Sequence, residues 1–284
     1  MISAKPRKLL LVHAHPDDES ITTGGTIARY AAEGAEVTVV TCTLGEEGEI
    51  APPELTLLGA WAADQLGGYR SGELAGAGAA LGLSRHRYLG GIGRWRDSGM
   101  AGTPAAEHPR AFTRGAVVGQ VEQLTELLDE LRPQVVVTYD AFGGYGHPDH
   151  IRAHEITMAA ASRAASVARV FHTVSSQSAV SRGLAALRAR GGSPFRVPPE
   201  GELPVTPDEM ITTVLDVEAH LPAKLAALRA HATQLTVHAD DQSVYQSAHF
   251  ALTNDVAQPI PPHEYFVLAH GPVPGAATDL FGGL

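Results

Sequence analysis

Two short runs of histidines and carboxylates carry the clearest chemistry in this sequence. HAHPDDE covers residues 13–19, and YDAFGGYGHPDH covers residues 139–150. Imidazole nitrogen and carboxylate oxygen suit Zn²⁺, which in catalytic sites takes three protein ligands and keeps one position open. Two ligands from the first run and one from the second would complete such a site. The simpler alternative is that Asp17 or Asp18 only caps a helix and that the histidines are incidental.

Both runs follow apolar segments that have the length of a buried strand. KLLLVHAH (8–15) leads into the first run, and PQVVVTYD (133–140) leads into the second. Helical spacing follows the first run through Ile27, Tyr30 and Ala31, and Gly34 ends it. In a parallel sheet, ligands bind outside the carboxyl ends of the strands. We therefore expect the two loops to converge at one edge of a sheet.

The alternation of strand and helix patterns predicts an α/β fold. EVTVVTCTL (36–44) follows the first helix directly, which indicates a βαβ crossover and a parallel sheet. Further strands are expected near Tyr88 and at residues 168–175, 211–217 and 264–270, and amphipathic helices at 117–131 and 221–228. We expect one domain over 1–284: a Rossmann-like, doubly wound, mostly parallel sheet over about 1–170, then a C-terminal elaboration over about 171–284. GGSPFRVPPEGELPVTP (191–207) is expected to form a surface loop.

Composition excludes several classes of protein. With 284 residues, 44% of them hydrophobic, the chain can bury a large core, and its net charge of -10 disfavours nucleic acid and anionic membranes as partners. A lone cysteine, Cys42, cannot form an internal disulfide, which favours a reducing cytoplasm. The apolar run from Leu9 to Val12 is too short for a signal peptide or a membrane span. A small molecule is the expected partner, and the oligomeric state stays open.

The two runs together resemble the zinc-dependent N-acetylglucosamine deacetylases, a family that includes phosphatidylinositol-glycan de-N-acetylases and bacterial thiol-biosynthesis deacetylases. Longer stretches are similar to the mycothiol-pathway members: VHAHPDDES, VTCTLGEEGE, DQLGGYRSGEL, GRWRDSGMAGT, VVVTYDAFGGYGHPDH and RAHATQ. The similarity extends from about Leu9 to about Tyr265 and is weakest between about Ser166 and Pro207. It implies a cytoplasmic enzyme that hydrolyses the acetamide of GlcNAc-inositol.

The resemblance also implies a role for each residue of the first run. It makes His15, Asp18 and His150 the ligands of one zinc ion per subunit, with Asp17 beside them as the general base. His13 is then a neighbour of the metal site. Zinc can generate a nucleophile at neutral pH and polarise the acetyl carbonyl, and a carboxylate next to a ligand is well placed to take the proton of the attacking water. Fe²⁺ would also suit two imidazoles and one carboxylate.

In the second run, the resemblance implies that Tyr145 donates a hydrogen bond to the developing oxyanion and that Asp149 orients an imidazole from behind. His147 would stabilise the oxyanion or protonate the departing amine. Asp17, once it has accepted a proton, could protonate the amine instead, and the sequence does not separate these assignments.

The substrate contacts implied by the resemblance are more widely spread. They are Glu49 in TLGEEGE, Arg70 in GGYRSGE, and Asp97 with Met100 in WRDSGM. An isolated loop Arg or Asp is more often solvated or salt-bridged, so only the match of the surrounding residues favours a role in sugar binding.

Other readings remain. A mycothiol S-conjugate amidase would use the same metal loops, as would another N-acetyl-sugar deacetylase of the same superfamily. A non-catalytic, metal-dependent sugar-binding module would need no base, and the presence of Asp17 counts against it. No G-x-G-x-x-G motif supports a dinucleotide site. The scattered later histidines, including His231, are expected to be core or surface residues, and Trp61 is expected to pack a helix.

Overall fold

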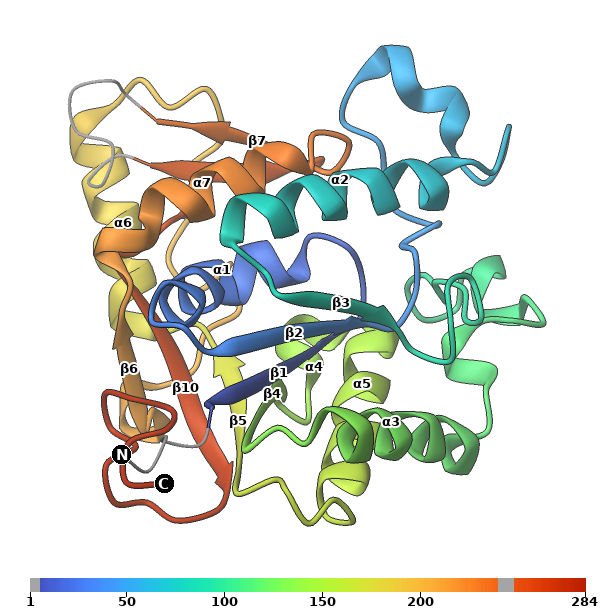
Figure 1. Ribbon diagram of the computed structural model, residues 1–284. Helices are drawn as coiled ribbons and strands as arrows, with labels where there is room; N and C mark the ends of the chain where they lie inside the picture. The colour runs from blue at the N-terminus through green and yellow to red at the C-terminus, as the bar shows by residue number, and fades with distance from the viewer. Residues whose placement is uncertain (1–5, 240–247) are drawn as a thin grey trace.

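The computed structural model describes residues 6–239 and 248–284. Its centre is a sheet with the strand order β3-β2-β1-β4-β5-β10-β6 (Figure 1). The strands are β1 (Lys8–His13), β2 (Glu36–Thr41), β3 (Arg85–Tyr88), β4 (Val135–Tyr139), β5 (Arg169–Val174), β6 (Thr213–Asp216) and β10 (His263–His270). Neighbouring strands from β3 to β5 are parallel, whereas β10 is antiparallel to both β5 and β6. The predicted α/β fold with a mostly parallel sheet is confirmed.

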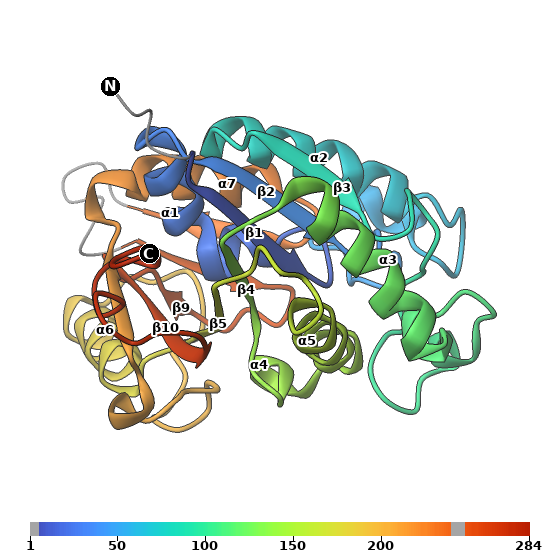
Figure 2. The same ribbon diagram turned by 60° about the horizontal axis from the view of Figure 1, so that its bottom comes forward.

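Helices cover both faces of this sheet, as Figures 1 and 2 show. One face carries α1 (Asp18–Ala32), α2 (Leu66–Leu81) and α7 (Leu221–Ala230), and the other carries α3 (Val117–Leu131) and α5 (Pro148–Ala161). Two further helices are the single-turn α4 (Gly143–Gly146), before α5, and α6 (Gln177–Arg190), which contacts the C-terminal part of the chain.

The alternation of side chains along the strands divides the core into two layers. Leu9 and Leu11 of β1 point to the face that packs against α1, α2 and α7. Leu10 and Val12 point to the other face, which packs against α3 and α5. All four are at most 1% exposed, because a strand covered by helices on both faces must be apolar at consecutive positions.

The C-terminal part of the chain contributes to two sheets. A small antiparallel sheet has the order β7-β8-β9, formed by β7 (Leu235–His238), β8 (His249–Leu252) and β9 (Gln258–Pro259), whereas β6 and β10 extend the main sheet. The buried Arg169 donates hydrogen bonds to the carbonyl oxygens of Pro272, Pro274 and Leu280 and so fastens the last segment to β5. Residues 191–207 form no helix and only isolated bridges, as expected for a loop.

Trp61 and Cys42 differ in exposure. Trp61 is 76% exposed, because residues 59–64 form turns closed by hydrogen bonds to the carbonyl oxygen of Gly59, so the expectation that it packs a helix is wrong. Cys42 is buried at the end of β2. Within residues 6–239 and 248–284, none of the helices is long and apolar enough to span a bilayer.

Candidate active site

The two histidine-carboxylate runs lie at the carboxyl ends of β1 and β4, which are neighbours in the sheet. The chain leaves β1 into α1 on one face and leaves β4 toward α5 on the other (Figure 1). Open α/β sheets bind ligands at the point where the loops after neighbouring strands diverge in this way. The predicted convergence of the two loops is therefore observed.

Where the two loops meet, three atoms that could bind a metal ion form a nearly equilateral triangle. The Nε2 atom of His150 lies 3.3 Å from Nδ1 of His15, and Oδ2 of Asp18 lies 3.4 Å from each of these nitrogens. All three side chains are buried. Tetrahedral Zn²⁺ with bonds of about 2.0–2.1 Å separates its ligand atoms by about 3.3–3.4 Å, so the spacing and the donor types fit such an ion.

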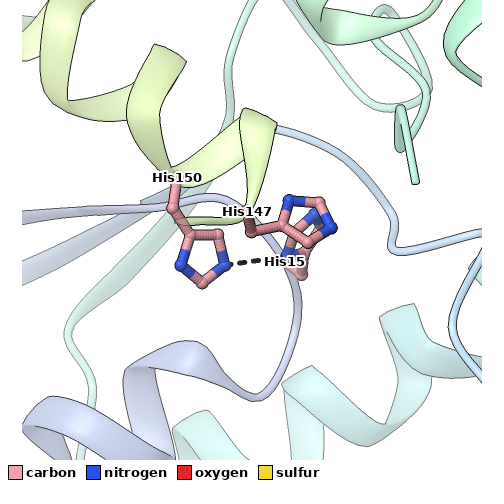
Figure 3. A group of neighbouring side chains, drawn as sticks. All are labelled: His15, His147 and His150. Carbon is pink, nitrogen blue, oxygen red and sulfur yellow. Dashed lines mark hydrogen bonds between the residues drawn. The ribbon is translucent and has the colours of Figure 1, made fainter. Parts of the chain in front are cut away.

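In both His15 and His150, the ring nitrogen that lies outside the triangle has a hydrogen-bond partner. This partner orients the ring so that its other nitrogen faces the centre of the triangle. Nε2 of His15 lies 3.3 Å from Oδ2 of Asp149, which also accepts a hydrogen bond from the Ser98 N–H. Nδ1 of His150 lies 3.1 Å from the carbonyl oxygen of Gly143. These acceptors hold the ring protons on the outer nitrogens, so the lone pairs of both rings face one point. Figure 3 shows His150 and His15 turned toward each other.

His147 lies beside His15 (Figure 3) but is bonded differently. Its ring centroid is 4.6 Å from that of His15, and its Nδ1 accepts the N–H of Asp149 and so caps α5. Burial lowers the pKa of His147 to about 3. The neutral ring therefore carries its proton on Nε2, where it can act as a hydrogen-bond donor.

Asp17 occupies a strained turn between β1 and α1. Its φ of 114° is unusual for a residue with a side chain and costs about 1–3 kcal/mol. Its carboxyl makes no capping bond to the helix; Oδ2 accepts instead from the buried Arg70, 3.1 Å away. Burial raises the pKa of Asp17 to about 6, although the Arg70 charge opposes this shift. The capping alternative thus does not describe this carboxyl.

Nη1 and Nη2 of Arg70 also donate to the carbonyl oxygens of Gly45 and Pro16, respectively. The Arg70 side chain is only 3% exposed. Its contacts are those of a residue that holds the turn.

The remaining residues singled out in the sequence follow β2, β3 and β4. The buried Asp97 has Oδ1 3.5 Å from Nε2 of His15 and 2.8 Å from the N–H of Gly99. Tyr145 is 51% exposed, and its ring meets that of His150 edge-on, with centroids 5.0 Å apart. Glu49 and Met100 are exposed, and Glu49 accepts a hydrogen bond from Thr253.

Several residues that sequence reasoning did not assign to the site support it. The Tyr139 ring stacks on the ligand ring of His150 with centroids 4.2 Å apart, and its hydroxyl accepts from the Ala14 N–H. His13 lies behind the site, 3.3 Å from that hydroxyl. Glu46 accepts the N–H of Asp97. Tyr139 and Glu46 lie within the motifs quoted above, and this position is what could have indicated from the sequence that they belong to the site.

Comparison with known proteins decides the family. The family model described as PIG-L, GlcNAc-PI de-N-acetylase, matches residues 10–161. A protein of Saccharomonospora viridis named 1D-myo-inositol 2-acetamido-2-deoxy-alpha-D-glucopyranoside deacetylase is 67% identical over 276 residues, covering 97% of this chain and 100% of the relative. This chain belongs to the GlcNAc-PI de-N-acetylase family. A protein of the same name from Actinosynnema mirum is 60% identical over 284 residues, covering 100% of this chain and 99% of its own length.

A solved structure of the N,N'-diacetylchitobiose deacetylase from Pyrococcus horikoshii shares the fold. Its TM-score is 0.53 at 19% identity, and the match covers 79% of this chain and 69% of that one. The segment matched by the GlcNAc-PI de-N-acetylase family model contains both loops of the ligand triangle but ends before the RAHATQ turn at 229–234.

Proposed function

We propose that this protein is a cytoplasmic, zinc-dependent deacetylase of mycothiol biosynthesis that hydrolyses the acetamide of GlcNAc-inositol to acetate and GlcN-inositol. The ligand triangle of His15, Asp18 and His150 carries the metal-dependent part of this proposal. We infer the substrate from the names of two full-length relatives, both GlcNAc-inositol deacetylases, which are 60% and 67% identical to this chain.

The three triangle residues are the proposed metal ligands, one ion per chain. When bound, zinc makes water more acidic and polarises the acetyl carbonyl. Asp149 and the Gly143 carbonyl oxygen keep the two imidazoles in the ligating tautomer. The same two imidazoles and one carboxylate also suit Fe²⁺.

Asp17 is the proposed general base. It precedes the ligand Asp18 directly, and Arg70 holds its carboxyl in place. It takes a proton from the attacking water and returns it to the amine as the C–N bond breaks. This assignment is favoured over proton donation by His147, because a second proton on that ring would occupy Nδ1, which accepts the Asp149 N–H.

His147 and Tyr145 are the proposed oxyanion donors. The neutral His147 ring offers Nε2–H, and the half-exposed Tyr145 offers a hydroxyl that is protonated at neutral pH, its pKa raised further by partial desolvation and the nearby Asp18 charge. We assign sugar contacts to Glu49, Asp97 and Met100, which follow β2 and β3 at the same edge of the sheet, and to Arg70 on α2. Arg70 also acts on the reaction through Asp17.

The test is release of acetate and free amine from GlcNAc-inositol, with GlcNAc and a mycothiol S-conjugate alongside. We expect preferential cleavage of GlcNAc-inositol that disappears on chelation and returns with Zn²⁺. Cleavage of the conjugate alone would replace the proposal with an amidase. Binding of metal and sugar without any cleavage would leave a sugar-binding module.

A further inference from the structure

A buried pair of residues outside the ligand triangle connects α7 to the Asp17 turn. His231 follows the last residue of α7, and its Nε2 lies 2.8 Å from Oε1 of Glu19 in α1. Both side chains are fully buried at 0% exposure. Because the Glu19 carboxylate is an acceptor, His231 Nε2–H is the donor.

The second oxygen of the same carboxylate reaches back to the strained residue. Oε2 of Glu19 accepts the N–H of Asp17 at 3.0 Å, and Oε1 also accepts the hydroxyl of Ser20 at 2.6 Å. The N–H of Asp17 is thus held in the orientation that goes with its φ of 114°. A residue stays in such a conformation only where its surroundings over-determine it.

The turn that carries His231 is itself anchored to the other elements around the site. Thr233 donates hydrogen bonds from its N–H and its hydroxyl to Glu73 of α2, at 2.8 and 2.7 Å. Its carbonyl oxygen accepts the N–H of Ala51, in the loop after β2. Glu73 lies one helical turn after Arg70, which bonds the Asp17 carboxyl from the opposite side. These hydrogen bonds therefore hold the turn that carries His231 against α2 and the loop after β2.

We propose that Glu19 and His231 are positioning residues for the general base: they fix the backbone of Asp17, while Arg70 fixes its carboxyl. This inference rests on the proposed function of Asp17. Without the His231 donor, the Glu19 carboxylate keeps only the Ser20 hydroxyl and the Asp17 N–H as donors and is held less firmly, so the turn can relax. A displacement of about 1 Å at a reacting group can lower the rate about 10²-fold.

The first test compares two substitutions of His231. We expect His231→Leu to lower kcat about 10- to 100-fold, with KM within about threefold and zinc content unchanged, because only the base moves. His231→Gln keeps an N–H donor near the position of Nε2 and is expected to recover most of the loss. If His231→Leu does not fold, Glu19→Gln takes its place with the same expectation, because it leaves one acceptor oxygen for the three donors of Asp17, Ser20 and His231.

Lys224→Met is the matched control. Lys224 lies on the same α7 and forms a buried ion pair with Glu264 at 2.6 Å, and Glu264 bonds the N–H groups of Gly25 and Thr26, more than one turn after Glu19 in α1. We expect a lower unfolding temperature at nearly unchanged kcat. An equal fall in kcat in this variant, or wild-type kcat in His231→Leu, would overturn the proposal.

A double-mutant cycle separates positioning from general destabilisation. In an Asp17→Asn background, His231→Leu is expected to lower kcat no further, because there is no base left to position. Loss of the same factor in both backgrounds would contradict the inference.

Hydrogen exchange supplies a readout that does not depend on activity. In the metal-free protein, His231→Leu is expected to speed exchange of the Asp17 amide at least tenfold, and Lys224→Met is expected to leave it unchanged. Unaltered exchange in His231→Leu would refute the positioning role even if kcat falls. A wild-type protein that cleaves none of the substrates would instead refute the proposed function, and the exchange result would still stand.

Discussion

The three neighbouring histidines of the site differ in what their rings can bind. The hydrogen-bond partner of each ring determines this difference. His15 has a carboxylate behind it and His150 a backbone carbonyl, so both offer a lone pair to the centre. His147 uses its Nδ1 to accept a backbone N–H and so keeps a proton on Nε2. The tautomer that each partner selects determines whether the ring is a metal ligand or a hydrogen-bond donor.

Asp17 and His150 are expected to respond differently to substitution. Asp17→Asn removes the base but no ligand, so kcat should fall about 10²- to 10⁴-fold with about one zinc per chain retained. His150→Ala removes a ligand and should lose both activity and zinc. Metal analysis and acetate release on the same preparations check both results, and near-wild-type kcat in Asp17→Asn would exclude it as the base.

Asp149 is expected to act on the metal through His15. Asp149→Ala removes the carboxylate that lies 3.3 Å from Nε2 of His15, so zinc affinity should fall about 10- to 100-fold. Competition with a chelator measures this affinity. Asp129→Ala, at an exposed position on α3, is the control and should bind zinc as the wild type does.

At the scale of elements, the sequence predicts which strand ends carry the candidate site, but not which helices supply the residues that hold it in place. The two motifs follow apolar strands, so their place at strand ends could be read from local periodicity. The Arg70 side chain points from α2 to the turn before α1, and His231 reaches Glu19 across more than two hundred residues. Such contacts depend on how the helices pack on the sheet, which the spacing of apolar residues does not encode.

The edge strand β3 carries a histidine that should make stability depend on pH. Burial lowers the pKa of His86 from 6.5 to about 4, and its Nε2 lies 2.9 Å from the hydroxyl of Thr41. Between these pKa values the unfolded chain binds more protons than the folded one, so this contribution is complete above pH 6.5 and is lost as the pH falls toward 4.

His86→Gln removes this titration and keeps a side-chain amide near Thr41. The free energy of unfolding should therefore fall less between pH 7.5 and pH 4.5 in the variant than in the wild type, by about 2 kcal/mol. Urea unfolding at the two pH values measures the difference. Parallel losses in the two proteins would show that His86 is not the titrating group.

At the scale of the whole molecule, the end of the chain completes the core that its beginning starts. Phe266 and Leu280 lie in the same buried cluster as Leu9 and Leu11. The segment of β10 was predicted as a strand, but its place between β5 and β6 was not, because the partner of a strand so distant in sequence leaves no local signal. One layered structure therefore supports both metal loops and the turn after α7.

In the proposed function, a single metal ion held by His15, Asp18 and His150 gives the protein its deacetylase activity. The most direct measurement is titration of the metal-free protein with Zn²⁺, with acetate release from GlcNAc-inositol followed at each addition. Activity should rise in proportion to bound zinc and reach its plateau at about one equivalent per chain. Full activity in the metal-free protein, or a zinc-loaded protein that releases no acetate, would contradict the account.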